Sequence, residues 1–541
     1  MISPKYKNIA YFIVSSFFLS ACNGTTNSAT TDSPADILDY QHWIENLPTG
    51  YTATQGNAYL MQNTDCALFV SIFGSCFGQN PSAPYIIPQP PIVNSYVDPY
   101  YATQLETPGP DGSTDIFYRL SNNDALITII SYPPKAAYLG YQSYVFTRES
   151  SDYAGITPTR SRVISPDPSR YDIFGSMGND INNVIVQNQY GISPWGGSVV
   201  MYITTSNQDL ANALITNAKA NGINPNSIFV EPVGSNVITG NDQSADDFIT
   251  LMRYAVPESV SAASNWESSL SKNVLVYKVS NPVVPVSRYE SNQYTAQTVN
   301  TDESSLQTAL QQLSSLLEDY LKAQVSVVSA SAYQTKATTI INPTTHIPES
   351  GLVGSSCIYY GTDCEGDNQD TSTYATLTES SVLLGLNEAA FIAGVNHSMP
   401  EINNNHYLSI DIYDASTASG VASASQTNLS SVGFSSGVLD GSAGQVLNNL
   451  GIAIPPADTE LSANISKLYV TFIARDCNNS MIAAASQFCI NLMGASLVPL
   501  TSPISIIERS YVMPGFTTGG YNPEMVYPYI IAASHDFITN P

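Results

Sequence analysis

The clearest hydrophobic periodicity in the chain lies in residues 302–324, where apolar residues recur every three or four positions. This spacing places them on one face of an α-helix. Asn300 and Glu303 have the spacing of a capping pair at its start. The segment predicts a helix of about 35 Å that packs against a core, with a coiled-coil seam between two chains as the alternative. The apolar positions are Leu306, Leu310, Leu313, Leu317, Tyr320 and Leu321.

A strand–helix–strand pattern lies in the N-terminal half. Apolar runs at 198–203 and 228–232 flank an amphipathic segment at 207–220. Ser206 and Asp209 have the spacing of a capping box at the start of that segment. A unit of this length predicts two parallel strands joined by a right-handed crossover helix.

Residues 244–257 predict a second helix in this half. Ser244 and Asp247 again have capping spacing, and apolar residues that include Phe248 and Leu251 recur at helical intervals. The proline that closes the segment would end or bend such a helix.

Residues 80–111 contain eight prolines. Because proline fixes φ and lacks a backbone N–H, this segment predicts extended chain that runs over a surface rather than inside a sheet.

Apolar and aromatic runs bounded by turn residues predict strands in both halves. No repeat of 20–50 residues is visible, which argues against solenoid and propeller folds. The pattern predicts an α+β fold with mixed sheets, a βαβ unit in the N-terminal half and a more β-rich C-terminal half. The other predicted strands are 116–120, 125–131, 138–147, 274–279, 325–331, 390–397, 406–413, 467–475 and 525–533.

The same pattern divides the chain into six segments. We expect a leader at 1–21, a flexible tether that begins with Cys22 at 22–35, and a segment at 36–112 that holds a short helix, a cysteine loop and the Pro-rich stretch. An α/β globular region at 113–299 and the long helix at 300–324 then precede a β-rich globular region at 325–541.

The net charge of the chain limits the classes of molecule that it can bind. The 541 residues include 18 Lys and Arg against 44 Asp and Glu, for a formal net charge of -26. A chain this acidic repels phosphate backbones, so nucleic acid is excluded as a partner. Charged residues make up only 11%, against about 25% in a typical soluble domain. The hydrophobic content of 43% and the 34 tyrosines nevertheless indicate a folded chain.

Residues 1–21 have the pattern of a secretory signal peptide. Lys5 and Lys7 precede an apolar stretch from Ile9 to Leu19, and small residues follow. A membrane-spanning helix needs about 20 apolar residues, so this stretch is too short to be one.

The end of this segment, Leu19-Ser20-Ala21-Cys22, closely resembles the lipobox of bacterial lipoproteins. The resemblance implies cleavage before Cys22, a thioether-linked diacylglycerol on its sulfur and acylation of its amino group. Several acyl chains anchor a protein firmly to a bilayer. Asn23 favours the outer membrane, because lipoproteins that stay in the inner membrane carry Asp at this place. The alternative is a secreted protein with a free Cys22.

The six remaining cysteines form three close pairs. Six cysteines allow 15 connectivities, but local pairing needs the least rearrangement of the chain. Disulfides agree with an oxidising, extracytoplasmic compartment. Zinc binding by thiolates is disfavoured, since no pair has the two-residue spacing of zinc sites. The predicted pairs are Cys66 with Cys76, Cys357 with Cys364, and Cys477 with Cys489.

Two histidines near an Asn-rich turn form a candidate metal site. If the strands on either side of the turn pair with each other, His397 and His406 stand opposite one another, with β-carbons about 5 Å apart. Both imidazoles could then reach one metal ion, with Glu401 or Asp411 as a third ligand. Solvated or hydrogen-bonded histidines are the alternative.

Gly433-Phe434-Ser435-Ser436-Gly437 matches the nucleophile-elbow pattern of serine hydrolases. Ser435 is the candidate nucleophile and His535 a candidate base, with an acid such as Asp476. The residues before Ser435 are a poor strand, so a flexible Ser/Gly loop is the alternative. The sequence has no phosphate-binding loop, haem motif, Rossmann fingerprint or regular calcium loop, so no cofactor is predicted.

These features predict a lipid-anchored protein of the bacterial outer membrane, facing the periplasm or the cell surface. We expect a binding or structural module whose ligand is a glycan or a protein. The alternative is an envelope-anchored hydrolase that acts on polysaccharide or ester substrates. A Ser, a His and an acid in contact, or two carboxylates about 5–10 Å apart in a cleft, would favour the hydrolase.

Overall fold

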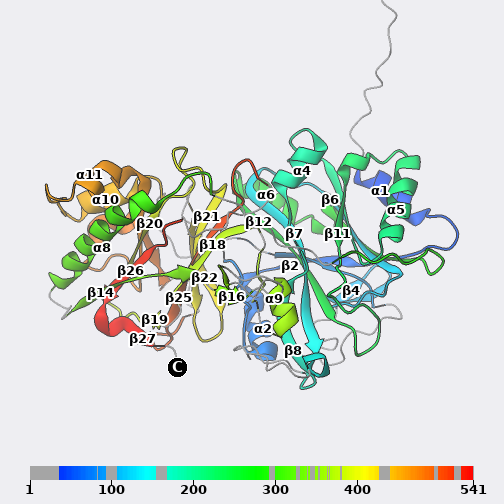
Figure 1. The fold of residues 1–541 in the computed structure, drawn as a ribbon, viewed down its shortest axis with the longest axis horizontal. Coiled ribbons are helices and arrows are strands. Elements are labelled where there is room, and N and C mark those ends of the chain that lie inside the picture. Colours follow the sequence, from blue (N-terminus) through cyan, green and yellow to red (C-terminus); the bar gives the residue numbers. More distant parts are fainter. Residues whose placement is uncertain are drawn as a thin grey trace, which may run out of the picture. The chain divides into compact units, whose positions relative to one another are not determined.

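Four large β-sheets, packed face to face in two pairs, carry the fold (Figure 1). One pair belongs to the N-terminal half (residues 36–290) and the other to the C-terminal half (residues 299–539). The computed structural model describes residues 36–81, 83, 85–92, 107–153, 167–178, 180–290, 299–324, 329–337, 339–341, 348–350, 354–361, 364, 366–368, 370–377, 380–425, 439–492, 498–516 and 525–539.

The N-terminal half contains the first and second sheets. The first sheet has the order β1 (Thr52–Gln55), β13 (Val274–Ser280), β6 (Asp124–Ser131), β10 (Val199–Thr205) and β11 (Ile228–Pro232). The second sheet has the order β2 (Asn57–Met61), β3 (Tyr85–Gln89), β12 (Asp247–Pro257), β7 (Ala136–Glu149) and β8 (Arg170–Ser176), with β9 (Ile181–Asn182) beside β7.

Both faces of the first sheet are buried, because alternate residues of its strands enter two different cores. In β6, Leu126 and Ile130 pack toward the second sheet, whereas Ile127 and Ile129 pack against helices. This double burial explains why the strands read as nearly continuous apolar runs. The helices of this half are α1 (Ile37–Glu45), α2 (Cys66–Phe73), α4 (Asn183–Tyr190), α5 (Gln208–Ala220), α6 (Val260–Glu267) and α7 (Leu270–Asn273), with 3₁₀ turns η1 (Asn63–Asp65), η2 (Ser150–Tyr153) and η3 (Pro225–Ser227).

The C-terminal half contains the third and fourth sheets. The third sheet has the order β14 (Ala330–Gln334), β26 (Tyr529–Ala533), β20 (Ala389–Val395), β23 (Leu468–Ala474) and β24 (Cys489–Asn491). The fourth sheet contains β15 (Lys336–Ala337), β18 (Thr371–Thr376), β25 (Ile504–Tyr511), β21 (Tyr407–Asp414) and β22 (Ser419–Ser425), with β19 (Ser380–Val382) added beside β25 and β27 (Phe537–Thr539) beside β19.

Helices cover the outer face of the third sheet in the same way (Figure 1). Leu310, Leu313 and Leu317 of α8 pack with Phe391 and Phe472 of the sheet. The helical segments are α8 (Gln307–Lys322), α9 (Gly354–Tyr360), α10 (Ser442–Asn449) and α11 (Thr459–Asn464), with 3₁₀ turns η4 (Ser304–Leu306), η5 (Ile465–Lys467), η6 (Ala483–Phe488) and η7 (Ser534–Asp536). The two-stranded ribbons are β4 (Thr107–Gly109) with β5 (Gly112–Thr114), and β16 (Thr339–Ile341) with β17 (Pro348–Ser350).

The two halves repeat one topology. In the first and third sheets, the strands stand in the order first, fifth, second, third and fourth along the chain, and only the last pair is parallel. The second sheet (β2-β3-β12-β7-β8) and the five-strand path β15-β18-β25-β21-β22 of the fourth sheet also match each other strand for strand. The fold is therefore a tandem repeat of one two-sheet unit.

Each half sends a disulfide-closed loop onto the other half. The N–H groups of Cys76 and Gly78 donate to the carbonyls of Thr417 and Ala418 (2.7 and 2.9 Å). Reciprocally, the N–H groups of Cys364 and Gly366 donate to the carbonyls of Ile173 and Phe174 (2.8 and 2.9 Å). Such reciprocity is the mark of two related units that meet about an approximate two-fold axis.

Two arginines at matching places reinforce this junction. Arg253 of β12 donates to the carbonyl of Gly366 (2.8 Å), and Arg509 of β25 donates to the carbonyl of Gly78 (3.2 Å). Both glycines have positive φ, +63° at Gly78 and +70° at Gly366, a conformation that glycine adopts without strain. The two loops therefore have the same kind of turn and form hydrogen bonds with equivalent residues of the opposite half.

Several predictions about elements are confirmed. The α+β class, the parallel βαβ unit β10–α5–β11 and the long amphipathic helix α8 are present, and the C-terminal half is the richer in strands. Within the described residues, no helix is long and apolar enough to cross a membrane. The described residues belong to one compact unit.

The predicted helix at 244–257 is wrong. Residues Asp247–Pro257 form β12 in the middle of the second sheet, and most of their side chains are buried. A run that is apolar on both faces fits helical and strand periods equally well. Asp247 is not a cap but pairs with the buried guanidinium groups of Arg119 (2.6 Å) and Arg170 (3.0 Å).

Two predicted helix caps and the position of the Pro-rich segment also need correction. The cap of α5 is Asn207 rather than the predicted Ser206, and the Asn207 side chain accepts hydrogen bonds from two backbone N–H groups. Glu303 is not a cap but points into a polar cluster described below.

Tyr85–Gln89 of the Pro-rich segment is a strand inside the second sheet. Its proline, Pro88, is tolerated beyond the two residues that pair with β12. Residues 116–120 form only an isolated bridge.

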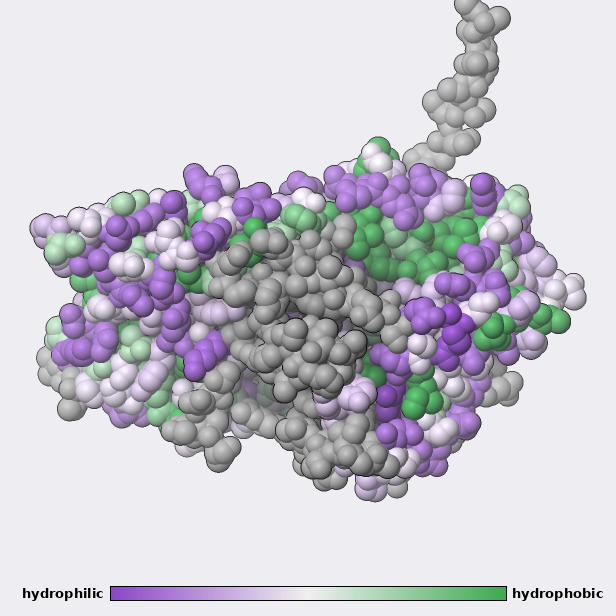
Figure 2. All heavy atoms as spheres, viewed as in Figure 1, coloured by the Kyte–Doolittle hydropathy of each residue, from purple (hydrophilic) through white to green (hydrophobic). Residues whose placement is uncertain are grey.

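Hydrophilic side chains cover much of the face in Figure 2, and hydrophobic ones gather mainly over the N-terminal half, on the side where Figure 1 labels α5.

The predicted signal peptide, Cys22 and the tether lie outside the described residues, as does Ser435.

Candidate functional site

The candidate site lies where two chain segments cross between the third and fourth sheets of the C-terminal half. One segment leads from β19 to β20, and the other leads from β26 through η7 to β27. The strands pair on both sides of the crossing, with Val382 opposite Phe537 and Phe391 opposite Ile531. The two connecting segments are therefore held side by side at a fixed spacing.

This crossing brings three polar side chains together. Nε2 of His535 lies 2.8 Å from Oε1 of Glu388 and 3.2 Å from Oδ1 of Asp536. One ligand atom from each residue lies within 4.8 Å of the other two. The side chain of His535 is 55% exposed, whereas that of Asp536 is 1% exposed. The cluster is therefore buried on the side of Asp536 and open to solvent on the side of His535.

The cluster perturbs the titration of all three groups. Burial raises the pKa of the Asp536 carboxyl to about 7, and the charge of Glu388 adds to this shift. The hydrogen bond to Glu388 raises the pKa of His535. Burial alone would raise the pKa of Glu388, but the hydrogen bonds from His535 and from the Gly385 N–H lower it. Perturbed pKa values that gather at one place on the surface are a feature of functional sites.

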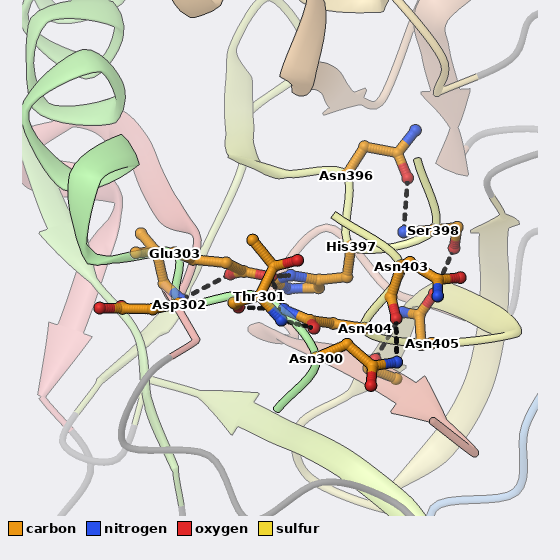
Figure 3. Close-up of polar contacts among 12 residues, drawn as sticks. Asn300, Thr301, Asp302, Glu303, Asn396, His397, Ser398, Asn403, Asn404 and Asn405 are labelled. Atoms are coloured by element: carbon orange, nitrogen blue, oxygen red, sulfur yellow. Dashed lines mark hydrogen bonds and ion pairs between the residues drawn. The ribbon is translucent and has the colours of Figure 1, made fainter. Parts of the chain in front are cut away.

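His397 lies in a second cluster, which is fully buried (Figure 3). Its Nδ1 lies 2.7 Å from Oε1 of Glu303, just before α8, and its Nε2 lies 3.3 Å from Oε1 of Glu508 on β25. Burial alone would lower the pKa of His397, but the two carboxylates outweigh that effect and raise it to about 10. The imidazole is therefore a buried cation between two anions.

Every carboxylate oxygen in this second cluster has a partner. Asn404 and the Val526 N–H donate to Glu303 (2.8 and 2.9 Å), and the Tyr469 hydroxyl donates to Glu508 (2.6 Å). A complete network of this kind holds α8, the turn after β20 and β25 together. The oxygens of Glu303 and Glu508 already accept hydrogen bonds from the protein itself, so the cluster is structural.

The structure does not bring the predicted metal ligands together. The strands on either side of the turn, β20 and β21, lie in different sheets and do not pair with each other. His397 is buried between its two glutamates, whereas His406 and Glu401 are exposed. Asp411 faces Arg509 at 3.6 Å. Among the described residues, the one group of three metal-ligating side chains contains His535 instead.

His535 was predicted as a catalytic base for Ser435, and its neighbours in the structure are Glu388 and Asp536. Ser435 lies outside the described residues, so the serine-hydrolase hypothesis stays a prediction. The three predicted disulfides are confirmed: Cys66–Cys76, Cys357–Cys364 and Cys477–Cys489.

A third polar cluster joins the two halves. The Tyr138 hydroxyl of β7 lies 2.8 Å from Oδ2 of Asp180 and 2.9 Å from Oδ2 of Asp370. A phenol has one proton to donate, so one of these buried carboxyl groups keeps a proton of its own. Burial and the charge of Asp370 accordingly raise the pKa of Asp180 well above its usual range, and burial raises the pKa of Asp370 to about 6. This cluster is enclosed by the junction and serves to hold it.

Sequence reasoning missed Glu388, the residue that completes the first cluster. Glu388 and His535 are 147 positions apart, and no motif links them. The adjacent pair His535-Asp536 near the end of the chain was the one local signal. The contact of His535 with Glu388 and the burial of Asp536 could not be inferred without the strand pairing.

Comparisons with known proteins do not place the chain in a family. No protein-family model and no curated protein matches it. The crystal structure of the VPA0106 protein from Vibrio parahaemolyticus aligns with 87% of this chain and 100% of its own, at a TM-score of 0.32 and 10% identity. The N-terminal CBM22-1-CBM22-2 tandem domain of Paenibacillus barcinonensis Xyn10C aligns with 91% and 96%, at a TM-score of 0.13 and 8% identity. Both TM-scores are below 0.5, so neither bears on function.

Proposed function

We propose that this chain is a lipid-anchored bacterial cell-envelope protein whose disulfide-closed body acts as a binding module. The observation that carries the proposal is the set of three disulfides. Such bonds form and persist in oxidising compartments and are rare in the cytosol. They support the export that residues 1–21 predict, and with it the acylation that the Leu19–Cys22 motif implies.

Binding is favoured over a purely structural role by the cluster around His535. The carboxylate oxygens of the His397 cluster all have partners within the fold. The His535 cluster instead combines an exposed imidazole with a buried carboxylate. An open polar site on a framework stiffened by strand pairing is what a binding protein needs.

The anchor is tested by expressing the full chain in a bacterium with radiolabelled palmitate. We expect the wild-type protein to carry the label and to fractionate with the outer membrane. Cys22→Ala removes the acylated sulfur, so that protein should lose the label and leave the membrane fraction. Ser20→Ala, which keeps the cysteine, is the matched control and should behave as the wild type.

Mass spectrometry of the mature N-terminus decides the outcome. A diacylglycerol-modified, N-acylated Cys22 supports the proposal. An unmodified thiol at Cys22, or a chain that stays in the cytosol with residues 1–21 attached, would overturn it.

A further inference from the structure

One ring nitrogen of His535 faces two carboxylates at the same time. Nε2 lies 2.8 Å from Glu388 and 3.2 Å from Asp536. An imidazole nitrogen has a single in-plane proton or lone pair, so its proton can serve only one of these oxygens. The hydrogen bond to Glu388 uses it. The cluster is thus incomplete as a hydrogen-bonded network.

Asp536 provides an independent observation. Its side chain is 1% exposed, yet neither of its carboxylate oxygens accepts a well-formed hydrogen bond from the described residues. A buried carboxylate without such bonds is costly, and buried charges in proteins are normally paired or coordinate a metal. Oδ1 of Asp536 points at the nitrogen that also faces Glu388. The side chain of Asp536 also interacts with that of Glu388, so the group that the cluster lacks between its two carboxyl groups is one of positive charge, either a shared proton or a metal ion.

We infer that Glu388, His535 and Asp536 bind one divalent transition-metal ion, with Zn²⁺ as the best-fitting example. The inference rests on the proposed binding function and names its ligand. An imidazole nitrogen with two carboxylate oxygens suits such ions, whereas Ca²⁺ and Mg²⁺ prefer oxygen ligands alone. Two carboxylates also balance the charge of a divalent cation.

The distances agree with this donor set. Zn²⁺ holds nitrogen and oxygen ligands at about 2.0–2.2 Å, so tetrahedral ligand atoms stand about 3.4 Å apart. The separations of 2.8 and 3.2 Å are slightly shorter than that value, and all three ligand atoms fall within 4.8 Å of one another. A small outward movement of His535, which is exposed, admits the ion.

The surroundings suit a metal site in two further ways. The Gly385 N–H donates to Oε2 of Glu388, which fixes the carboxylate and leaves Oε1 for the ion. Hydrogen bonds to the second oxygen of a ligand typically orient it. The exposed side of His535 leaves one coordination position open for water or for an external ligand.

The site lies in an addition that the N-terminal half lacks. In the repeated topology, β19 and β27 are the strands of the fourth sheet that have no counterpart in the second sheet. His535 and Asp536 lie in η7, in the connection from β26 to β27, and Glu388 lies in the connection from β19 to β20. The repeat supplies the scaffold, and the connections to the added strands supply the ligands.

The test is a calorimetric titration of Zn²⁺ into the full chain, purified without a histidine tag and stripped with a chelator. We expect one saturable site. His535→Ala removes a ligand, so the affinity should fall by about a hundredfold or more, beyond the 10–100-fold that second-shell partners cost. Glu388→Gln and Asp536→Asn keep side-chain size and should also weaken binding strongly.

His42→Ala is the matched control, because His42 is an exposed histidine on α1, far from the cluster in sequence. It should bind Zn²⁺ as the wild type does. Circular dichroism melting of each stripped variant identifies a loss of binding that comes from unfolding. Co²⁺ in place of Zn²⁺ gives a second readout, since its visible absorption reports nitrogen and oxygen ligands in a low-coordinate site.

Equal Zn²⁺ affinity in wild type and His535→Ala would overturn the inference, as would the absence of saturable binding in the wild type. Ca²⁺ binding as tight as Zn²⁺ binding would also overturn it, because that result indicates an acidic surface rather than this donor set. The anchor and the metal site fail separately. Zn²⁺ binding by a chain with an unmodified Cys22 overturns only the anchor, and an acylated chain without Zn²⁺ binding overturns only the metal site.

Discussion

The two halves of the molecule have the same strand order in both of their sheets, yet they differ in where polar groups gather. In the N-terminal half, the buried carboxylates Asp246 and Asp247 pair directly with arginines. In the C-terminal half, two histidines each face two carboxylates. One topology can therefore be stabilised by different polar chemistry, and the connections to the added pair β19–β27 create an exposed cluster without a counterpart among the described residues of the first half.

The two histidine clusters show why residue types alone do not define a site. His397 uses both ring nitrogens, one for each glutamate, and is 0% exposed. His535 presents one nitrogen to two carboxylates and is 55% exposed. The first arrangement is complete and rigid, and the second leaves bonding capacity for a ligand. Burial and the count of satisfied atoms separate a structural cluster from a binding one.

The largest expected effect comes from breaking the complete cluster. His397→Ala leaves Glu303 and Glu508 buried without their shared cation, so we expect a loss of about 3–5 kcal/mol in the free energy of unfolding. Urea denaturation followed by circular dichroism measures it. His535→Ala is the matched control and should change stability by about 1 kcal/mol or less, because exposed ion pairs contribute little. Equal losses in the two variants would contradict the distinction between the clusters.

The next effect tests the reciprocity of the two halves. Replacing Cys66 and Cys76 by serine, or Cys357 and Cys364 by serine, removes one disulfide loop at the junction. The bonded residues are 10 and 7 positions apart, so each pair should cost a similar amount, about 2.5 kcal/mol. Urea denaturation of both variants gives the comparison. A large loss in one and none in the other would show that the junction depends on one half alone.

The smallest effect is a pH dependence that sharpens the assignment of His397. Its pKa is about 10 in the folded chain, against about 6.5 for an exposed histidine. The imidazolium therefore stabilises the fold fully below about pH 6.5, and this contribution is lost as the pH rises toward 10. One linked proton gives a slope of at most about 1.4 kcal/mol per pH unit.

Urea denaturation between pH 7 and 9 measures this slope, with His397→Gln as the control. The variant has no titrating imidazole, so its stability should fall less steeply over the same range. Parallel curves for the two proteins would show that His397 carries no proton of unusual affinity.

Much of the fold could be predicted from local pattern. The helix α8, the parallel unit β10–α5–β11 and the three disulfides were all recognisable, because periodicity and short cysteine separations act within a few residues. The error at Asp247–Pro257 has the same origin. A strand buried on both faces shows no alternation, so its local pattern carries no information about its type.

The sequence by itself determined the local elements and the close disulfide pairs, since each depends on neighbouring residues, and it carries the prediction of export and of a lipid anchor. The tertiary structure alone decided that the chain folds as two equivalent halves and that His397 and His535 play different roles. The contact between Glu388 and His535 joins positions 147 residues apart. It exists because strand pairing in two sheets brings their connections side by side, and long-range pairing of this kind has no local signature in the chain.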